Sequence, residues 1–345
     1  MTLVVVPPLQ RPPARPRGTH RVQLHGCGLG TGWSLTAHVP PDCLPQTLRQ
    51  VVVAELAAVT AEMSGWAPES QLCRFNRGVP GSWHRFSSGH FGVLQAALRI
   101  AAATGGAFDP CLGAAVDRWG FGPSGPVAVP PDPASSCAAA AFGRRAGAGW
   151  QDLLLDLPRQ AVRQPGGVTL DLSAIGKGHA VDRVCEAVRA LGVASLLVEI
   201  GGELRGEGVK PDGSPWWVGL EEVPVPADSR RDRGPGHECR REGGAIVALH
   251  GQAIATSGDY RRHFWHAGRR YGHVLDPATQ HPAQTDIAAV SVLARDCMQA
   301  DAFATALASQ EAAAALAMAD DLGLAAFLRL RDGGVRCSAA LAAML

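Results

Sequence analysis

The chain has 345 residues, enough for one large domain or two closely joined ones, and its 32 Lys plus Arg nearly balance 31 Asp plus Glu, for a net charge of +1. This balance excludes the broad basic surface of a general nucleic-acid binder, and 46% hydrophobic with 18% charged residues exclude disorder along the whole length. The nine cysteines are scattered and never spaced as C-x-x-C, which favours reduced thiols over a disulfide framework or a zinc site.

The first 19 residues are rich in Pro and Arg and are predicted to be a disordered leader, followed by a single domain over residues 20–345. Leu3 to Val6 is the only apolar run before prolines interrupt it, so the leader lacks the apolar region of a secretion signal. No apolar stretch reaches the roughly 20 residues that cross a bilayer. We therefore expect no membrane span and a cytoplasmic location.

The first half of this domain is predicted to mix strands and helices. Alternating residues predict two strands between His20 and His38, joined by the turn GCGLGTG. Apolar residues at helical spacing predict helices over about 48–63 and 91–103, with ESQLCRFNRG as a polar loop between them. The stretch 123–149, rich in Pro, Ala, Ser and Gly, is predicted to be a surface loop.

The second half continues this alternation. A strand from Val168 leads into DLSAIGKGHAVD and a helix that ends at Gly192. Further strands are predicted at 195–200, 216–220, 245–249, 271–275 and 287–293. The charged segment 224–244 is predicted to be a solvated loop. A helix containing Asp301 to Leu307, an Ala-rich helix and closing strands complete the chain.

One polar cluster and one histidine each allow both a functional and a structural interpretation. Thr256, Ser257 and Asp259 surround Gly258, whose missing side chain would let backbone N–H groups approach a phosphate, but a turn between strands has the same composition. His273, on a predicted strand, is either a catalytic base or a structural histidine.

Asp301 and Thr305 are four residues apart on a predicted helix, so their side chains lie on one face. Their hard oxygen atoms suit Mg²⁺, which takes few protein ligands and keeps positions for water and a substrate phosphate. The alternative is a polar strip in which Thr305 bonds back to the carbonyl of Asp301.

The order of several motifs along the chain resembles the FAD:protein FMN transferase family, often called ApbE, from about Leu29 to Leu307. The matching segments are LGT at 29–31, LCRFN at 72–76, GAFDP at 106–110, LDLSAIGKGHAVD at 170–182, IGGE at 200–203, TSGDY at 256–260, HVLDP at 273–277 and DAFAT at 301–305. Together they span most of the chain.

The resemblance implies an α+β flavin transferase fold, with mixed and antiparallel sheets and flanking helices around a cleft for FAD. It implies Mg²⁺ ligands from the side chains of Asp301 and Thr305 and from the backbone carbonyl of Ala174, with His273 as the catalytic base. The flavin or phosphate contacts that it implies are Leu29, Gly30, Thr31, Arg74, Asn76, Asp109, Lys177, Gly201, Gly202, Glu203, Ser257, Gly258, Asp259 and Asp276.

The implied reaction transfers FMN from FAD, the substrate, to a Thr or Ser hydroxyl of a target flavoprotein, forming a phosphoester and releasing AMP. A histidine, with an ordinary pKa of about 6.5, can accept the proton of that hydroxyl near neutral pH. Hydrolysis of FAD to FMN and AMP, or flavin binding without catalysis, are the alternatives. The chain departs from the family pattern at four positions, where Cys73, Cys111, Glu203 and Gln280 stand for Ser, Thr, Asp and Gly.

Overall fold

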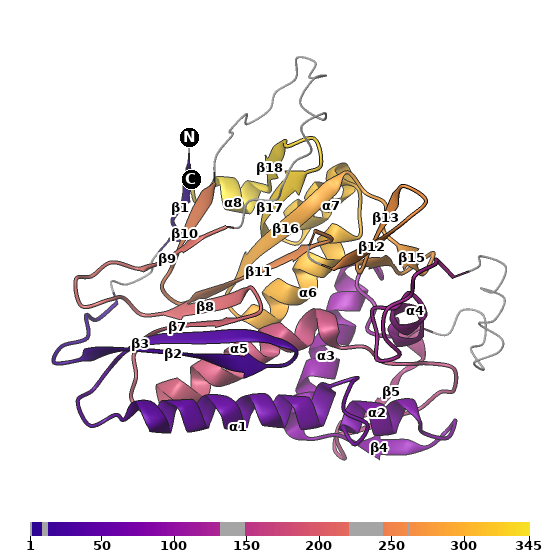
Figure 1. The fold of residues 1–345 in the computed structure, drawn as a ribbon, viewed down its shortest axis with the longest axis horizontal. Coiled ribbons are helices and arrows are strands. Elements are labelled where there is room, and N and C mark those ends of the chain that lie inside the picture. The colour runs from indigo at the N-terminus through magenta and orange to yellow at the C-terminus, as the bar shows by residue number, and fades with distance from the viewer. Residues whose placement is uncertain (1, 9–12, 132–148, 221–243, 261) are drawn as a thin grey trace. The chain divides into compact units, whose positions relative to one another are not determined.

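The computed structural model describes residues 2–8, 13–131, 149–220, 244–260 and 262–345, which form helices and mainly antiparallel sheets (Figure 1). The predicted α+β class is confirmed. The chain divides into two compact units. The first unit comprises Met1–Ala57, Lys177–Tyr260 and Gln284–Leu345, and the second comprises Ala58–Gly176 and Arg261–Ala283.

The first unit is built on an eight-stranded sheet with the order β18-β17-β16-β11-β8-β7-β3-β2. In that order the strands are Val335–Cys337, Ala325–Leu330, Ile287–Ala294, Gln252–Gly258, Glu203–Glu207, Ser195–Ile200, Thr31–Val39 and His20–Gly28. Every neighbouring pair is antiparallel. This arrangement places β11, from the last third of the sequence, between β16 and β8.

A smaller sheet in the same unit contains part of the predicted leader. Strand β1 (Leu3–Val5) pairs in parallel with β10 (Ala245–Leu249), which pairs antiparallel with β9 (Trp216–Gly219). Leu3 and Val5 are buried in a hydrophobic cluster that these sheets share. The expectation of disorder was therefore wrong for these residues, because alternate apolar side chains allow even a short strand to bury one face on an existing sheet.

Helices pack against the large sheet of the first unit. Helix α6 (Cys297–Ala308) packs against β11 and β16, and α7 (Ala312–Asp321) packs against α6 and β17, whereas α8 (Ala339–Ala342) contributes Leu341 to the hydrophobic cluster. In β11, Ile254 joins the hydrophobic cluster on one face, whereas Ser257 bonds to Thr305 of α6 on the other. This alternation follows from the period of two in a strand, and it decides which polar groups of β11 face α6.

Two longer helices each contain one of the points at which the chain passes from one unit to the other. They are α1 (Pro45–Met63) and α5 (Ser173–Ala190). In α1, Leu48, Val52 and Leu56 are buried at the helical spacing seen in the sequence. The predictions of both helices are confirmed, although the strand expected before α5 is reduced to an isolated bridge between Thr169 and Leu112.

The second unit combines short helices with small sheets. Its helices are α2 (Gln71–Asn76), α3 (Ser88–Ala103), α4 (Gly113–Arg118) and the 3-10 helix Trp150–Asp152. Its sheets are β4-β6-β5 (Trp83–Arg85, Ala161–Arg163, Leu154–Asp156), β12-β13 (His263–His266, Arg269–Gly272) and β14-β15 (Leu275–Asp276, His281–Pro282). A cluster of Leu112, Ala115, Trp119, Phe121 and Leu275 forms part of its core.

Two predictions of local structure in this unit were wrong. The segment expected to be a polar loop contains α2, because Ser70 accepts the N–H of Cys73 as a cap while Leu72 and Phe75 are buried. His273 does not lie on a strand, since β13 ends at Gly272. Residues 132–148 of one expected loop and 224–243 of the other lie outside the described residues.

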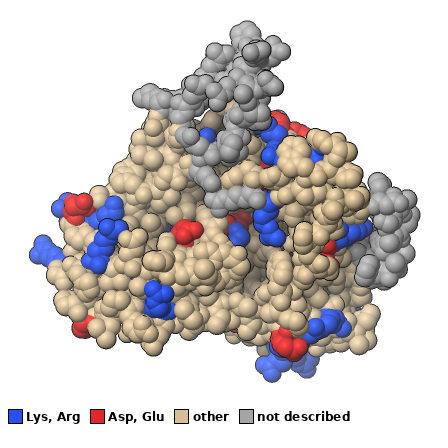
Figure 2. Space-filling view, viewed as in Figure 1, with Lys and Arg blue, Asp and Glu red and all other residues tan. Residues whose placement is uncertain are grey.

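Charged side chains lie in small groups separated by uncharged surface on the face shown in Figure 2. Among the described helices, none combines the length and apolar character that a membrane span requires.

Candidate functional site

The predicted metal pair lies on α6 in the first unit. Asp301 is buried, and its Oδ2 accepts the backbone N–H of Gly178 at 3.0 Å, while its Oδ1 lies 4.0 Å from Nζ of Lys177. One turn later, Oγ1 of Thr305 lies 2.9 Å from Oγ of Ser257 on β11. The predicted helix is confirmed, and β11 adds a hydroxyl beside its two oxygen-bearing side chains.

Gly178 allows α5 to approach α6 closely. A Cβ at this position would lie 2.2 Å from the carbonyl oxygen of Cys297 and 2.9 Å from Cβ of Asp301. Any larger residue would push the two helices apart and break the bond between Gly178 and Asp301. The motif G-K-G therefore serves helix packing at its second glycine.

Lys177 pairs with two buried carboxylates. Its Nζ donates a hydrogen bond to Oε1 of Glu203, a residue of β8 that is only 2% exposed. Burial raises the pKa of Glu203 to about 7, Lys177 opposes the rise, and the nearby charge of Asp301 adds to it. Burial also raises the pKa of Asp301, against Lys177 and the N–H of Gly178. The single ammonium of Lys177 therefore forms ion pairs with both carboxylates.

The ammonium of Lys177 is stabilised by the same arrangement. Burial would lower the pKa of Lys177, but Asp301 and Glu203 outweigh that effect and raise it. The other carboxylate oxygen of Glu203, Oε2, is buried and has no hydrogen-bond partner among the described residues. The site thus has two buried carboxyl groups for one ammonium and an unsatisfied oxygen, which favours a cation.

These donors fit Mg²⁺ by their chemistry. Carboxylate and hydroxyl oxygens are the ligands that a small hard cation prefers. The described residues contain no group of three or more His, Cys, Asp or Glu that could hold a metal by themselves. A metal held by Asp301 and Thr305 therefore needs backbone, water or substrate oxygens to complete its coordination.

The predicted residues 29–31 and 201–202 form two turns that lie side by side in the first unit. Leu29 and Gly30 join β2 to β3 with φ angles of 52° and 72°, as a two-residue hairpin turn requires. Gly201 has a φ of 66°, and a Cβ there would lie 2.9 Å from Cγ2 of Thr31. Gly202 donates its N–H to Glu199 at 2.9 Å.

The segment 256–259 is not a loop between strands, because β11 continues to Gly258. A Cβ at Gly258 would lie 2.7 Å from the carbonyl oxygen of Ala288, so this glycine allows close contact with the neighbouring strand. Asp259 accepts two hydrogen bonds from Arg331, at 2.8 and 3.2 Å. Sequence reasoning missed Arg331, because no motif marks it.

In the second unit, three predicted ligand contacts have structural partners. Arg74 donates to the carbonyl of Glu69, and Asn76 exchanges two hydrogen bonds with the backbone of Leu170, at 2.8 and 2.9 Å. Asp109 accepts the N–H of Cys111 at 2.8 Å. These bonds stabilise the turns that carry the family motifs.

The second unit also contains His273 and Asp276. Nδ1 of His273 lies 3.2 Å from the carbonyl oxygen of Arg262, so this nitrogen carries a proton and Nε2 is the basic nitrogen of the neutral ring. Asp276 accepts the N–H of Ala278 and the hydroxyl of Thr279, at 2.9 and 2.8 Å. Gln280, where the family has glycine, adopts a φ of 59°, which lies in the left-handed region.

Comparison with known proteins agrees with this arrangement. The ApbE family model matches residues 29–328. An FAD:protein FMN transferase from Vibrio cholerae is 32% identical over 317 residues, which cover 91% of this chain and 89% of the relative. One from Haemophilus influenzae is 33% identical over 288 residues, which cover 82% and 78%.

Solved structures have the same fold. The flavinyl transferase ApbE of Pseudomonas stutzeri, in its apo form, matches with a TM-score of 0.81 and 32% identity over 94% of this chain and 97% of that chain. The flavin transferase ApbE of Vibrio cholerae matches with a TM-score of 0.81 and 30% identity over 95% and 100%. The resemblance seen in the sequence is confirmed, and the chain belongs to the ApbE family.

Proposed function

We propose that this chain transfers FMN from FAD to a Thr or Ser hydroxyl of a target flavoprotein, with Mg²⁺ bound and with release of AMP. The pair of buried Asp301 and half-buried Thr305 on α6 carries this proposal, in a chain whose relatives are named FAD:protein FMN transferases. A carboxylate and hydroxyl oxygens beside a second buried carboxyl group suit a divalent cation on a pyrophosphate.

Ala174 stays the proposed backbone ligand. In a regular α-helix the N–H of Gly178 would bond to the carbonyl four residues earlier, which is that of Ala174. Here the same N–H donates to Asp301 at 3.0 Å, so the two acceptors compete for it. This competition supports a carbonyl of Ala174 with a lone pair available for a metal.

The proposed chemistry assigns one task to each group. A bound Mg²⁺ would neutralise charge on the phosphate oxygens of FAD. His273 accepts the proton of the acceptor hydroxyl at Nε2, and its ring is oriented by the contact of Nδ1 with the carbonyl of Arg262. The hydroxyl oxygen forms a bond to the FMN phosphorus as the bond to AMP breaks, which yields the phosphoester and AMP.

Incubation of the protein with FAD, Mg²⁺ and an acceptor flavoprotein tests this proposal. Mass spectrometry should detect an FMN adduct on the acceptor, and replacement of the acceptor hydroxyl or addition of EDTA should abolish it. His273→Ala should lower the rate by about 100-fold or more. Asp301→Asn should abolish the Mg²⁺-dependent activity, whereas Asp296→Asn, at the cap of the same helix, should leave it intact.

The same experiment separates transfer from the alternatives. Release of free FMN without an acceptor, together with no adduct on any acceptor, would show hydrolysis instead. Bound FAD that neither EDTA nor His273→Ala affects, with no turnover, would show a flavin-binding protein and contradict the proposal.

A further inference from the structure

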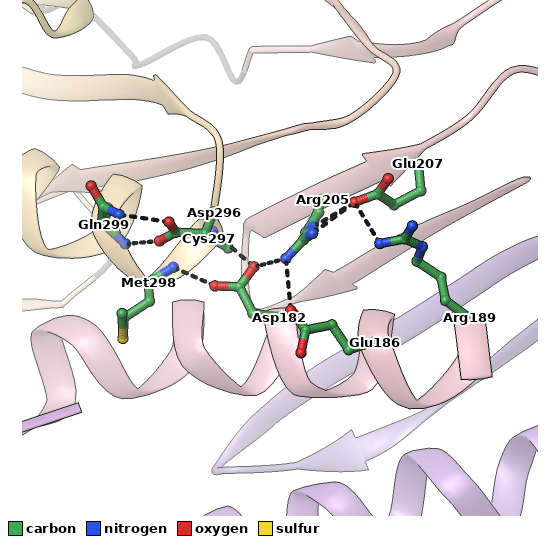
Figure 3. Close-up of polar contacts among 9 residues, drawn as sticks. All are labelled: Asp182, Glu186, Arg189, Arg205, Glu207, Asp296, Cys297, Met298 and Gln299. Carbon is green, nitrogen blue, oxygen red and sulfur yellow. Dashed lines mark hydrogen bonds and ion pairs between the residues drawn. The ribbon is translucent and has the colours of Figure 1, made fainter. Parts of the chain in front are cut away.

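Strand β8 places three charged side chains beneath the helices of the first unit. Leu204 packs against the hydrophobic cluster, so Glu203, Arg205 and Glu207 lie on the opposite face of the strand. Glu203 reaches Lys177 near the metal pair. Arg205 and Glu207 form a separate buried network with α5 and the start of α6, shown in Figure 3.

Arg205 links α5 to β8 through short hydrogen bonds. Its Nη1 donates to Oδ1 of Asp182 at 2.7 Å, and its Nε and Nη2 donate to Oε1 of Glu207 at 2.9 and 2.7 Å. Arg205 and Asp182 are each 8% exposed. Glu207 thus holds the guanidinium in one orientation, and the guanidinium holds the carboxylate of Asp182.

Asp182 in turn binds the beginning of α6. Its Oδ1 and Oδ2 accept the N–H groups of Cys297 and Met298, each at 2.9 Å, although 115 residues separate Asp182 from Cys297 (Figure 3). The local cap, Asp296, accepts the N–H of Gln299. Two carboxylates therefore satisfy the first turn of α6, and their charge also suits the positive end of the helix dipole.

The same face of α5 holds α6 at a second point. Gly178, one turn before Asp182, donates its N–H to Asp301, one turn after Cys297. The two contacts fix both the position of α6 along its axis and its rotation about it. The orientation of the Asp301 carboxylate thus depends on Asp182 and Arg205, although neither of them bonds to it.

We infer that Asp182, held by Arg205, is a positioning residue that sets the affinity of Asp301 and Thr305 for a divalent cation. This inference rests on the proposed function of that pair. Neither Asp182 nor Arg205 touches the metal or the substrate in this role. Partners that orient metal ligands in this way typically change metal affinity by 10- to 100-fold when they are removed.

Binding of Mn²⁺ alone, followed by electron paramagnetic resonance, tests the inference without turnover. Asp182→Asn keeps the size of the side chain but presents an NH₂ group to one of the two N–H donors, and we expect about a 10-fold higher Kd for Mn²⁺. Asp296→Asn is the matched control at the same helix end, because Asn caps a helix as well as Asp, and its Kd should match wild type. An unchanged Kd in folded Asp182→Asn would overturn the inference.

Kinetics and a double variant separate positioning from general structural damage. In Asp182→Asn the Mg²⁺ concentration for half-maximal activity should rise about 10-fold, while kcat at saturating Mg²⁺ stays within about 2-fold of wild type. The double variant Asp182→Asn/Arg205→Gln should raise the Kd for Mn²⁺ by much less than the two single effects combined, because both substitutions act through one carboxylate. Independent, fully additive effects would contradict the network.

Hydrogen exchange of the wild-type protein covers the case in which Asp182→Asn does not fold. Because coupling between two sites is reciprocal, Mn²⁺ should slow exchange at the amides of Cys297 and Met298. Unchanged exchange there under saturating Mn²⁺ would overturn the inference. If Mn²⁺ shows all these effects but wild-type protein never transfers FMN, the proposed function fails and the positioning role stands.

Discussion

Replacing Glu203 by Gln should make the stability of the protein less sensitive to pH. Glu203 is 2% exposed, and it shares the single ammonium of Lys177 with Asp301. Its pKa in the folded protein, raised by burial to about 7, lies above its ordinary value of 4.5. As pH rises, the unfolded chain therefore loses this proton first, and the stability present below about pH 4.5 is lost as pH passes through about 7.

The magnitude follows from the difference between the two pKa values of Glu203. A difference of about 2.5, at about 1.4 kcal/mol for each pKa unit, amounts to roughly 3 kcal/mol of unfolding free energy. Gln keeps an oxygen that can accept from Lys177 but has no proton to lose. Between about pH 5 and about pH 8.5, the unfolding free energy of Glu203→Gln should therefore gain about 3 kcal/mol relative to wild type.

Urea denaturation of both proteins at a series of pH values, in EDTA, measures this difference. Glu186→Gln, which removes an exposed carboxylate on α5, controls for loss of charge and should stay within about 0.5 kcal/mol of wild type. Parallel curves of unfolding free energy against pH for wild type and Glu203→Gln would refute the reasoning. They would show that Lys177 compensates both carboxylates fully.

Two further predictions concern packing and a buried ion pair. Gly178→Ala should lower the unfolding free energy by about 2 kcal/mol or more, because its Cβ would meet the carbonyl oxygen of Cys297 at 2.2 Å. Gly176→Ala, on the same helix with nothing described within 4 Å of its Cβ, should instead raise it by about 0.5 to 1 kcal/mol, and equal effects of the two substitutions in urea denaturation would contradict this account. Asp259→Asn and Arg331→Gln should each destabilise the fold by about 1 to 3 kcal/mol, because each breaks the paired hydrogen bonds at 2.8 and 3.2 Å. A large rise in KM for FAD in the Asp259 variant alone would instead indicate a direct flavin contact.

Two motif positions of this chain adopt a left-handed backbone without glycine. Gln280 takes a left-handed φ of 59°, and Leu29 one of 52°, although glycine adopts such angles with less strain. The carbonyl oxygen of Gln280 accepts the indole N–H of Trp119 at 2.9 Å, which stabilises this conformation. Sequence comparison treats Gln280 as a departure, and in this chain the position adopts the left-handed backbone that glycine favours.

Local patterns in the sequence were sufficient to predict most helices and strands, and to place the two side chains of the proposed metal pair on one face of a helix. The spacing of apolar residues predicted α1 and α3, and alternation predicted β2 and β3. A separation of four residues already placed Asp301 and Thr305 on one helical face. These features depend on neighbours within one or two turns, which the sequence displays directly. The helix α2 was missed because its cap and two buried residues lie within an otherwise polar segment.

Tertiary structure decided which charges meet. Lys177 and Glu203 are 26 residues apart, Arg331 and Asp259 are 72 apart, and Asp182 reaches across 115 residues to cap α6. Such pairs depend on the order of the strands in the large sheet and on the face that each strand turns toward the helices, and neither is encoded in a short segment. The sequence therefore determined the residues that can bind a cation, and the packing of β8, α5 and α6 determined how they are held.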